Sequence, residues 1–136
     1  PAWRSSKSRS SVSFSLASSL ARKNPLGAIA AHRAAFAGRP DRMLVLKVGN
    51  PGDFPDDFAT LRAAAAEAGN VVLETRTLPA ADAHAMTRAA DIVLSLHRAE
   101  GFGLIPAEAM LLGRPVVATG WSGNLDFMDD ASAALV

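Results

Sequence analysis

The stretch AEGFGLIPAE, residues 99–108, places two carboxylates on either side of a run that contains two glycines and a phenylalanine. Glu100 and Glu108 are too far apart in sequence to be neighbours on one helical turn. Glycine lets a ligand approach the backbone closely, and the free N–H groups at a helix start form a ready site for a phosphate. A helix beginning near Leu104 or Ile105 would leave Glu100 in the preceding loop and Glu108 about one turn inside. Both carboxylates can then face one crevice, where an anionic group would contact the backbone and hydroxyl groups would contact a carboxylate.

The elements that must hold this stretch alternate between apolar runs of strand length and stretches with helical periodicity. The strands are rich in β-branched residues or Leu and mostly continuous, as in a parallel sheet covered on both faces, and we expect them at residues 12–17, 43–48, 70–75, 91–96 and 115–120. The helices are Ala-rich, and we expect them at residues 25–37, 56–69, 80–89 and 105–113. Pro25 and Pro106 lie near helix starts, and Gly69 and Gly113 lie at helix ends. The alternation predicts an α/β fold with a doubly wound, Rossmann-like parallel sheet and right-handed crossovers.

The order of these elements gives the glutamate stretch a particular place in the fold. An open sheet of this kind binds ligands beyond the carboxyl ends of its strands, where the strand order reverses. The segment from His97 to Glu108 follows the strand expected at 91–96 and leads into the next helix. It therefore lies where a ligand would be expected.

Length and composition limit the classes of function. The chain has 136 residues, of which 49% are apolar, and this suits one ordinary globular domain. It contains no cysteine, which excludes a disulfide framework or a cysteine-rich metal site and fits a reducing compartment, so we expect a cytoplasmic location. No apolar run approaches the roughly 18–20 residues that cross a bilayer. The sequence does not begin with Met and stops within what reads as an element, so we expect it to be part of a longer chain.

Charge is distributed unevenly along the chain. Residues 1–40 carry seven basic side chains and no acidic one, whereas all 13 acidic side chains follow. The Ser-rich, basic start is typical of a solvated linker and also of a transit peptide. Because the chain then runs on into a helix without a cleavage-like break, we assign residues 1–11 to a linker and residues 12–136 to the domain. Nucleic acid is not an expected partner, because the basic residues are not interleaved with aromatic ones and the whole chain is nearly neutral.

Residues 100–124, EGFGLIPAEAMLLGRPVVATGWSGN, resemble the signature of the retaining GT-B glycosyltransferases called glycosyl transferases group 1, or family 4. The family pattern is a Glu, seven residues and a second Glu, then a helix, G-x-PVVAT and a glycine-containing turn. Upstream, ADIVLSLHRAEGFG extends the match, and SSLARKNPLGAI is similar to the family's loop that carries Arg and Lys after the first strand of the donor domain. The resemblance covers residues 12–136. It implies the C-terminal half of a GT-B architecture, without the N-terminal domain that mostly holds the acceptor.

The resemblance also implies a role for individual residues. Glu108 would hydrogen-bond the ribose hydroxyls of a nucleotide-sugar donor, and Glu100 would lie near the transferred sugar as the candidate catalytic residue. Backbone N–H groups at Gly103 and Leu104 would meet the diphosphate, which Lys23 would neutralise. The full set of donor-binding candidates is Arg22, Lys23, Gly101, Phe102, Gly103, Leu104 and Glu108. No metal or other cofactor is implied, because basic side chains and a helix terminus can supply the charge stabilisation of a cation.

The sequence departs from the family pattern at three positions. The family's Arg, about five residues before the Lys, falls at Ser18, and Arg22 is the candidate substitute. His97 stands where Ser is common, and a lone histidine of this kind is more often structural than catalytic. Asp126 stands near where an acidic residue often follows the glycine turn. The nucleotide, the sugar and the acceptor are left open.

Two other classes of function are weighed against the glycosyltransferase. One is a sugar-nucleotide epimerase or binding relative with the same GT-B architecture. The other is a non-enzymatic α/β interaction module of the response-regulator type, which is disfavoured because no acidic cluster with a phosphoacceptor Asp follows residues 12–17 or 43–48. The favoured hypothesis is the donor-binding domain of a retaining, hexosyltransferase-type enzyme of carbohydrate biosynthesis, inactive without the rest of its chain. Peripheral membrane association of the parent protein stays open.

Overall fold

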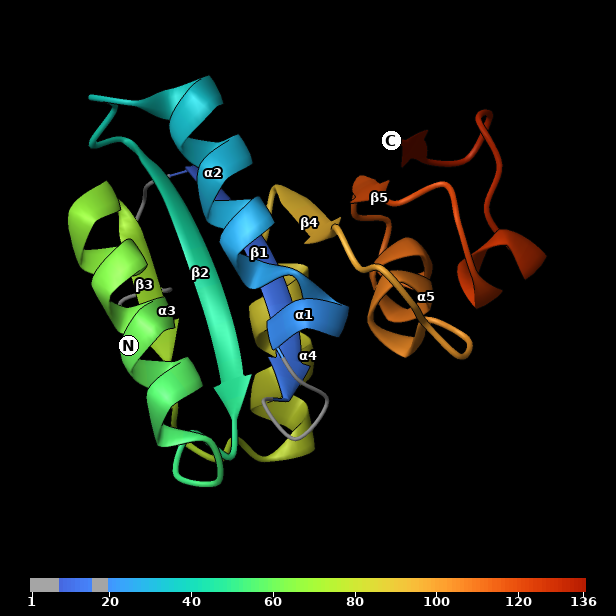
Figure 1. Ribbon diagram of the computed structural model, residues 1–136. Helices are drawn as coiled ribbons and strands as arrows, with labels where there is room; N and C mark the ends of the chain where they lie inside the picture. Colours follow the sequence, from blue (N-terminus) through green and yellow to red (C-terminus); the bar gives the residue numbers. More distant parts are fainter. Residues whose placement is uncertain (1–7, 16–19) are drawn as a thin grey trace.

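The computed structural model describes residues 8–15 and 20–136, with side chains from Leu20 onward. Within these residues a parallel sheet has the strand order β3-β2-β1-β4-β5-β6 (Figure 1). The strands are β1 Ser8–Ser15, β2 Arg42–Gly49, β3 Val71–Glu74, β4 Ile92–Ser95, β5 Val116–Ala118 and β6 Ala134–Leu135. The order reverses between β1 and β4, which is the switch point of a doubly wound sheet. The predicted fold class is confirmed.

Helices cover both faces of the sheet. They are α1 Leu20–Lys23, α2 Pro25–Phe36, α3 Pro55–Ala68, α4 Ala80–Arg88, α5 Leu104–Leu111 and the 3₁₀ helix η3 Gly123–Asp126. α2 and α3 lie on one face, and α4 and α5 lie on the other (Figure 1). In the described part of the chain, no helix combines the length and the apolar character needed to cross a membrane.

The predicted elements agree with the structure within a few residues except at the N-terminus. The strand expected at 12–17 begins at Ser8, and β1 pairs with β2 from Ser8↔Arg42 to Ser15↔Gly49. Residues 8–11, which we assigned to a linker, therefore belong to the sheet. Their Ser-rich composition carries no hydrophobic signal, so the sequence does not indicate a strand here. These residues are in a strand because they pair with β2, not because of their intrinsic propensity. Residues 1–7 and 16–19 lie outside the described residues.

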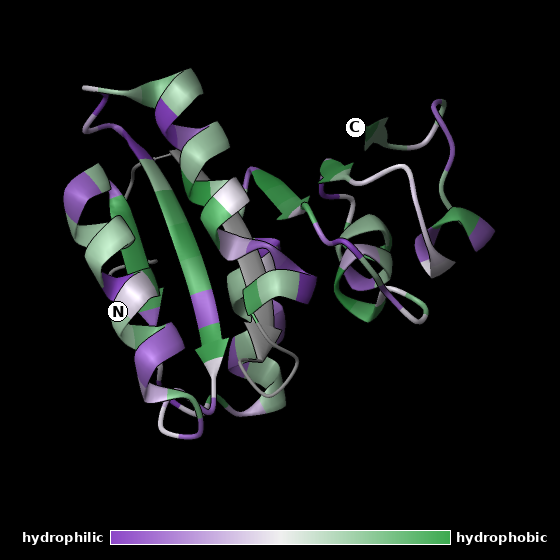
Figure 2. Cartoon of the chain, in the orientation of Figure 1, coloured by the Kyte–Doolittle hydropathy of each residue, from purple (hydrophilic) through white to green (hydrophobic). Residues whose placement is uncertain are grey.

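β2 connects the two layers of the core, because its side chains point alternately to opposite faces of the sheet. Leu44, Leu46 and Val48 are buried against α2 and α3, whereas Met43 and Val45 are buried on the α4 side. Figure 2 shows β2 as hydrophobic along most of its length, with a hydrophilic segment near its carboxyl end. Burial of each large apolar side chain contributes about 1.5–3 kcal/mol, so this strand anchors both helical layers.

His32 on α2 is an unusual member of this core. Its residue surface is only 3% exposed, and its ring is tilted against Phe36 with the ring centroids 5.1 Å apart. Neither ring nitrogen has a hydrogen-bond partner among the described residues. Burial lowers the pKa of His32, and the backbone of Arg42 opposes this effect only in part. The folded chain therefore favours the neutral imidazole.

Replacing His32 with Leu should raise the free energy of unfolding by about 1 kcal/mol near pH 7, because an unpaired buried polar group is removed. The pKa of His32 in the folded chain lies below the ordinary value of 6.5, so protonation of this histidine does not reduce the free energy of unfolding above that pH. Below pH 6.5 the chain loses the part of its stability that is linked to His32, because the unfolded chain takes up a proton that the folded chain resists. Urea titrations of both proteins between about pH 7 and pH 5 should therefore show a gain for the Leu variant that grows toward acid. Parallel pH profiles would contradict this role of His32.

Candidate functional site

The candidate site lies at the carboxyl edge of the sheet, where the segments that follow β1 and β4 meet. The N–H group of Arg98 donates to the carbonyl of Arg22 at 2.8 Å, and the Arg98 guanidinium donates to the carbonyl of Ala21 at 2.6 Å. In return, the Arg22 guanidinium donates to the carbonyl of Ala99 at 3.0 Å. Since each of these bonds uses a backbone group, α1 is held at a fixed position beside the loop after β4.

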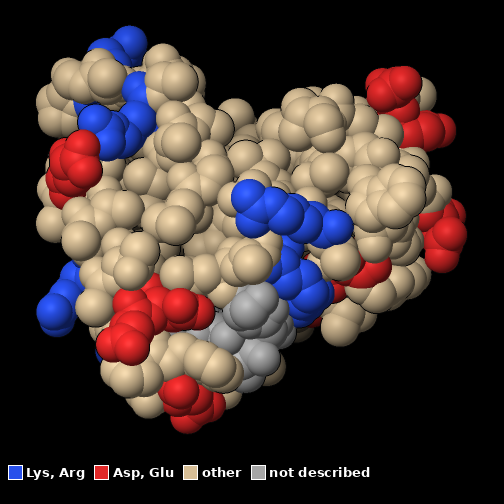
Figure 3. Space-filling view, viewed as in Figure 1, with Lys and Arg blue, Asp and Glu red and all other residues tan. Residues whose placement is uncertain are grey.

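Three predicted site residues come together at this contact. The Lys23 ammonium donates a hydrogen bond to the Oε2 atom of Glu100, 77 residues away, and their side chains are 18% and 14% exposed. Nη1 of Arg22 lies 3.9 Å from the same carboxylate oxygen. Figure 3 shows basic side chains gathered near the middle of this face, close to α1. Ser18, where the family pattern would place an Arg, lies outside the described residues.

Gly103 connects this charged cluster to the start of α5. It is buried and precedes the helix with a φ of 96°, a left-handed conformation that glycine adopts without strain. A Cβ at this position would lie 3.3 Å from Asn124 and 3.6 Å from the Glu100 side chain, so the Glu100 side chain borders the helix start. α5 has no side-chain cap, and Pro106 has no N–H group. The first N–H groups of the helix, those of Leu104 and Ile105, therefore have no intrahelical acceptor.

The turn after β5 holds the backbone of Glu100 from the other side. The N–H group of Glu100 donates to the Ser122 hydroxyl at 2.9 Å, and that hydroxyl donates to the Glu100 carbonyl at 2.6 Å. The N–H group of Gly123 donates to the same carbonyl at 3.1 Å. The sequence predicts a glycine-containing turn here but not this contact, because the contact joins two loops that are far apart in the chain.

His97 is a buried connector between β4 and the same turn. Its Nδ1 atom lies 2.9 Å from the Ser95 hydroxyl, and its Nε2 atom lies 3.1 Å from the Trp121 carbonyl and 3.0 Å from Oδ1 of Asn124. Both partners of Nε2 are acceptors, and the Asn124 amide nitrogen in turn donates to the Thr119 carbonyl. The proton therefore belongs on Nε2, and Nδ1 accepts from Ser95. These contacts agree with a structural role for His97, which the sequence favours over a catalytic one.

The two motif glutamates have different partners. Oε1 of Glu108 lies 3.6 Å from Nε2 of His84 on α4, and these side chains are 40% and 56% exposed. Glu108 is thus accessible from the surface, while Glu100 forms a charged cluster with Lys23 and Arg22, the Lys23 cluster. His84 was not predicted, because its position depends on how α4 packs against α5 and leaves no local signal in the sequence.

Large apolar side chains are exposed on the two site loops and at the start of α5. Phe102, predicted among the donor-binding residues, is half exposed, and its ring packs on Phe127 with the centroids 4.8 Å apart. Leu104 and Trp121 are also exposed. Trp121 was not among the predicted residues, since nothing in the sequence distinguishes it from a core tryptophan.

A second charged group lies farther along the same edge. Arg76 donates to both carboxylate oxygens of the buried Glu74 and holds the pKa of that carboxyl down at about 2. Burial lowers the pKa of nearby Lys47, an effect that the charge of Glu74 opposes. Within the described residues, no three His, Asp or Glu side chains gather as metal ligands would.

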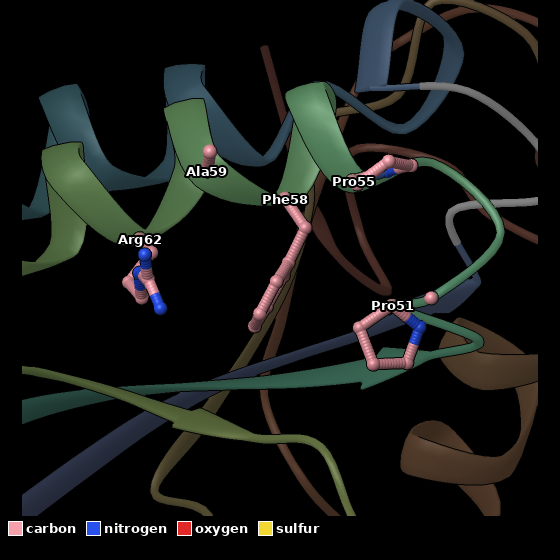
Figure 4. A pocket seen from close by; sticks show the side chains of 6 residues that line it. Pro51, Pro55, Phe58, Ala59 and Arg62 are labelled. Carbon is pink, nitrogen blue, oxygen red and sulfur yellow. The ribbon is translucent and has the colours of Figure 1, made fainter.

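A surface hollow of about 360 Å³ lies between α3 and the loop that precedes it (Figure 4). Its lining is mostly apolar and consists of Pro51, Gly52, Pro55, Phe58, Ala59 and Arg62. No predicted donor-site residue contributes to it, so the hollow and the Lys23 cluster are separate features.

Comparison with known proteins identifies both a family and a fold. The family described as glycosyl transferases group 1 matches residues 18–136. The C-terminal domain of LpcC, a glycosyl transferase group 1 family protein from Francisella tularensis, matches with a TM-score of 0.76 and 25% identity over 94% of this chain and 67% of that chain. Apo OtsA matches with a TM-score of 0.78 and 12% identity, over 99% of this chain and 33% of that one. A UDP-forming α,α-trehalose-phosphate synthase from Burkholderia xenovorans matches with a TM-score of 0.74 and 12% identity, over 98% and 34%.

These matches differ in what they establish. None of the curated protein sequences compared with the chain matches it. The chain spans about two thirds of the LpcC domain and about a third of the other two chains, and at 12% identity those two show the fold alone. The family match covers the whole described stretch from α1 to β6, including the Lys23 cluster and both motif glutamates. The chain therefore belongs to the glycosyl transferases group 1 family, and its fold is that of the C-terminal domains of GT-B glycosyltransferases.

Proposed function

We propose that this domain binds the nucleotide-sugar donor of a retaining glycosyltransferase at the switch point, between α1 and the start of α5. The observation that carries the proposal is the placement of the Lys23 and Arg22 cations beside Glu100, whose side chain borders Gly103. A diphosphate in this position would meet cations on one side and the first N–H groups of α5 on the other. Membership of the family and the likeness to the LpcC domain support the same assignment.

The two glutamates then serve different parts of the donor. Glu108 is accessible on α5, and a carboxylate can accept hydrogen bonds from both hydroxyls of a ribose. His84 lies beside Glu108 and would help to orient its carboxylate. Glu100 lies at the phosphate end, where the transferred sugar is attached, so its carboxylate would contact sugar hydroxyls.

The chemistry of transfer would depend mainly on charge and position. As the bond between the sugar and the diphosphate breaks, negative charge grows on the departing oxygen. Lys23, Arg22 and the start of α5 are placed to stabilise that charge. The acceptor hydroxyl must be held beside the same oxygen, and such positioning supplies a large part of the rate. We propose that the acceptor binds mainly on a second α/β domain of the parent protein.

The proposed donor site should bind a nucleoside diphosphate weakly, in roughly the micromolar to millimolar range, without added metal. The cations and the helix start already provide the positive charge that a divalent ion would bring. Calorimetric titrations with UDP, GDP and ADP, each with and without Mg²⁺, would measure this. A folded sample that binds none of the three would contradict the proposed function.

Replacing Glu108 with Gln should weaken binding of the preferred nucleoside diphosphate about tenfold, because hydrogen bonds to a charged acceptor are worth about 1.5–3 kcal/mol each. The matched control is Glu67→Gln on α3, where the carboxylate pairs with exposed Arg33 at 2.8 Å and faces no proposed ligand. Titration of the 2′-deoxy nucleotide sharpens the test, since the Glu108 effect should shrink with the hydroxyl gone. An undiminished loss with the deoxy nucleotide would show that Glu108 does not act on the ribose.

Gly123 should be essential for the contact between the two site loops. A Cβ added there would lie 1.9 Å from the Gly101 carbonyl oxygen, so Gly123→Ala must push the loops apart. We expect a loss of about 2 kcal/mol or more in the free energy of unfolding, together with weaker nucleotide binding. Gly120→Ala is the matched control in the same turn, because its nearest contact would be an ordinary 3.6 Å. Thermal melting and titration of both variants would check this, and equal behaviour of the two would refute it.

A further inference from the structure

Lys23 already has an anionic partner within the chain. Its ammonium donates to Oε2 of Glu100, and Arg22 approaches the same oxygen to 3.9 Å. The Glu100 carboxylate thus lies beside the cation that the proposed function assigns to a phosphate of the donor. The two anions cannot both occupy that place.

The backbone around the pair restricts how it can separate. The N–H and carbonyl groups of Glu100 are bound by Ser122 and Gly123, and the carbonyl of Arg22, next to Lys23, is bound by the N–H group of Arg98. The two backbones are therefore held in place, and the charges can part only by rotation of the two side chains.

Burial makes this pair different from an ordinary surface ion pair. The Lys23 and Glu100 side chains are 18% and 14% exposed, whereas those of Arg33 and Glu67, which also pair, are 48% and 68% exposed. Water screens a half-buried pair less, so the attraction is stronger and either partner is left in a worse environment when the pair breaks.

We propose that Glu100 is an internal counterion that the donor's diphosphate displaces from Lys23, and that the released carboxylate then binds hydroxyls of the transferred sugar. The inference rests on the proposed donor site. A diphosphate can replace a carboxylate at Lys23 because it carries more charge and more acceptor oxygens. An anion without a sugar would leave Glu100 without a new partner, so the exchange favours a complete donor over a bare phosphate compound.

Replacing Glu100 with Gln should tighten the binding of UDP and of inorganic diphosphate roughly three- to tenfold, because the competing charge is removed. The amide keeps the size of the side chain and an oxygen for contact with Lys23. Binding of uridine, which has no phosphate, should not change. Glu67→Gln is the matched control and should bind UDP like the original chain. The dissociation constants come from calorimetric titration.

A second background separates displacement from simple charge repulsion. In Lys23→Met, which removes the contested cation, adding Glu100→Gln should give no further gain. A full gain in that background would show that Glu100 merely repels the ligand, and would overturn the proposal. If Glu100→Gln fails to fold by circular dichroism, Glu100→Asp, which withdraws the carboxylate from Lys23, should tighten binding in the same direction.

The outcomes for the two proposals can be told apart. If the original chain binds none of UDP, GDP and ADP, the proposed donor site is wrong. If it binds one of them and the Glu100 variants bind it no tighter, the donor site stands and the counterion role is refuted.

Discussion

The hydrogen bonds that hold the loop after β4 between α1 and the turn after β5 determine the geometry of the candidate site. On one side Arg98 binds the backbone of α1, and on the other Ser122 and Gly123 bind the backbone of Glu100. Each such bond contributes only about 0.5–1.5 kcal/mol net. Together they join three segments from distant parts of the sequence, and the pairing of Lys23 with Glu100 depends on that arrangement.

His97 shows how a buried polar side chain can join a strand to a distant turn through hydrogen bonds. The family resemblance places a shorter serine at this position, and a serine could not reach the Ser95 hydroxyl, the Trp121 carbonyl and Asn124 together. The imidazole does, and each of its nitrogens has a partner, so its burial leaves no unpaired polar group. His32 is the opposite case, since it is equally buried but without such partners among the described residues. Burial alone therefore does not show whether a histidine stabilises the fold. The hydrogen-bond partners of its two ring nitrogens decide this.

Much of the fold could be predicted because hydrophobic runs and helical periodicity are local properties. The strand β2 and the helix α3 are found within a residue or two of their expected limits. The start of β1 could not be predicted, because Ser8 is in a strand only through its pairing with β2. The same holds for the site. The resemblance assigns Glu100 and Lys23 to one donor site without predicting their contact, which the structure shows. His84, Ser122 and Trp121 take their places through packing between distant segments, which leaves no local signal in the sequence.

The switch point explains why the charged groups and the helix start come from different halves of the chain. β1 and β4 are parallel neighbours, yet the segments that follow them lead to opposite faces of the sheet, with α2 on one and α5 on the other. The cations arrive with the β1 half, and Glu100 and the N–H groups of α5 arrive with the β4 half. In the proposed donor site a diphosphate would contact groups from both halves, so that site would depend on the β1–β4 pairing. A donor bound in this way would be thermodynamically linked to that pairing, and it would stabilise the sheet where the two halves of the fold are joined.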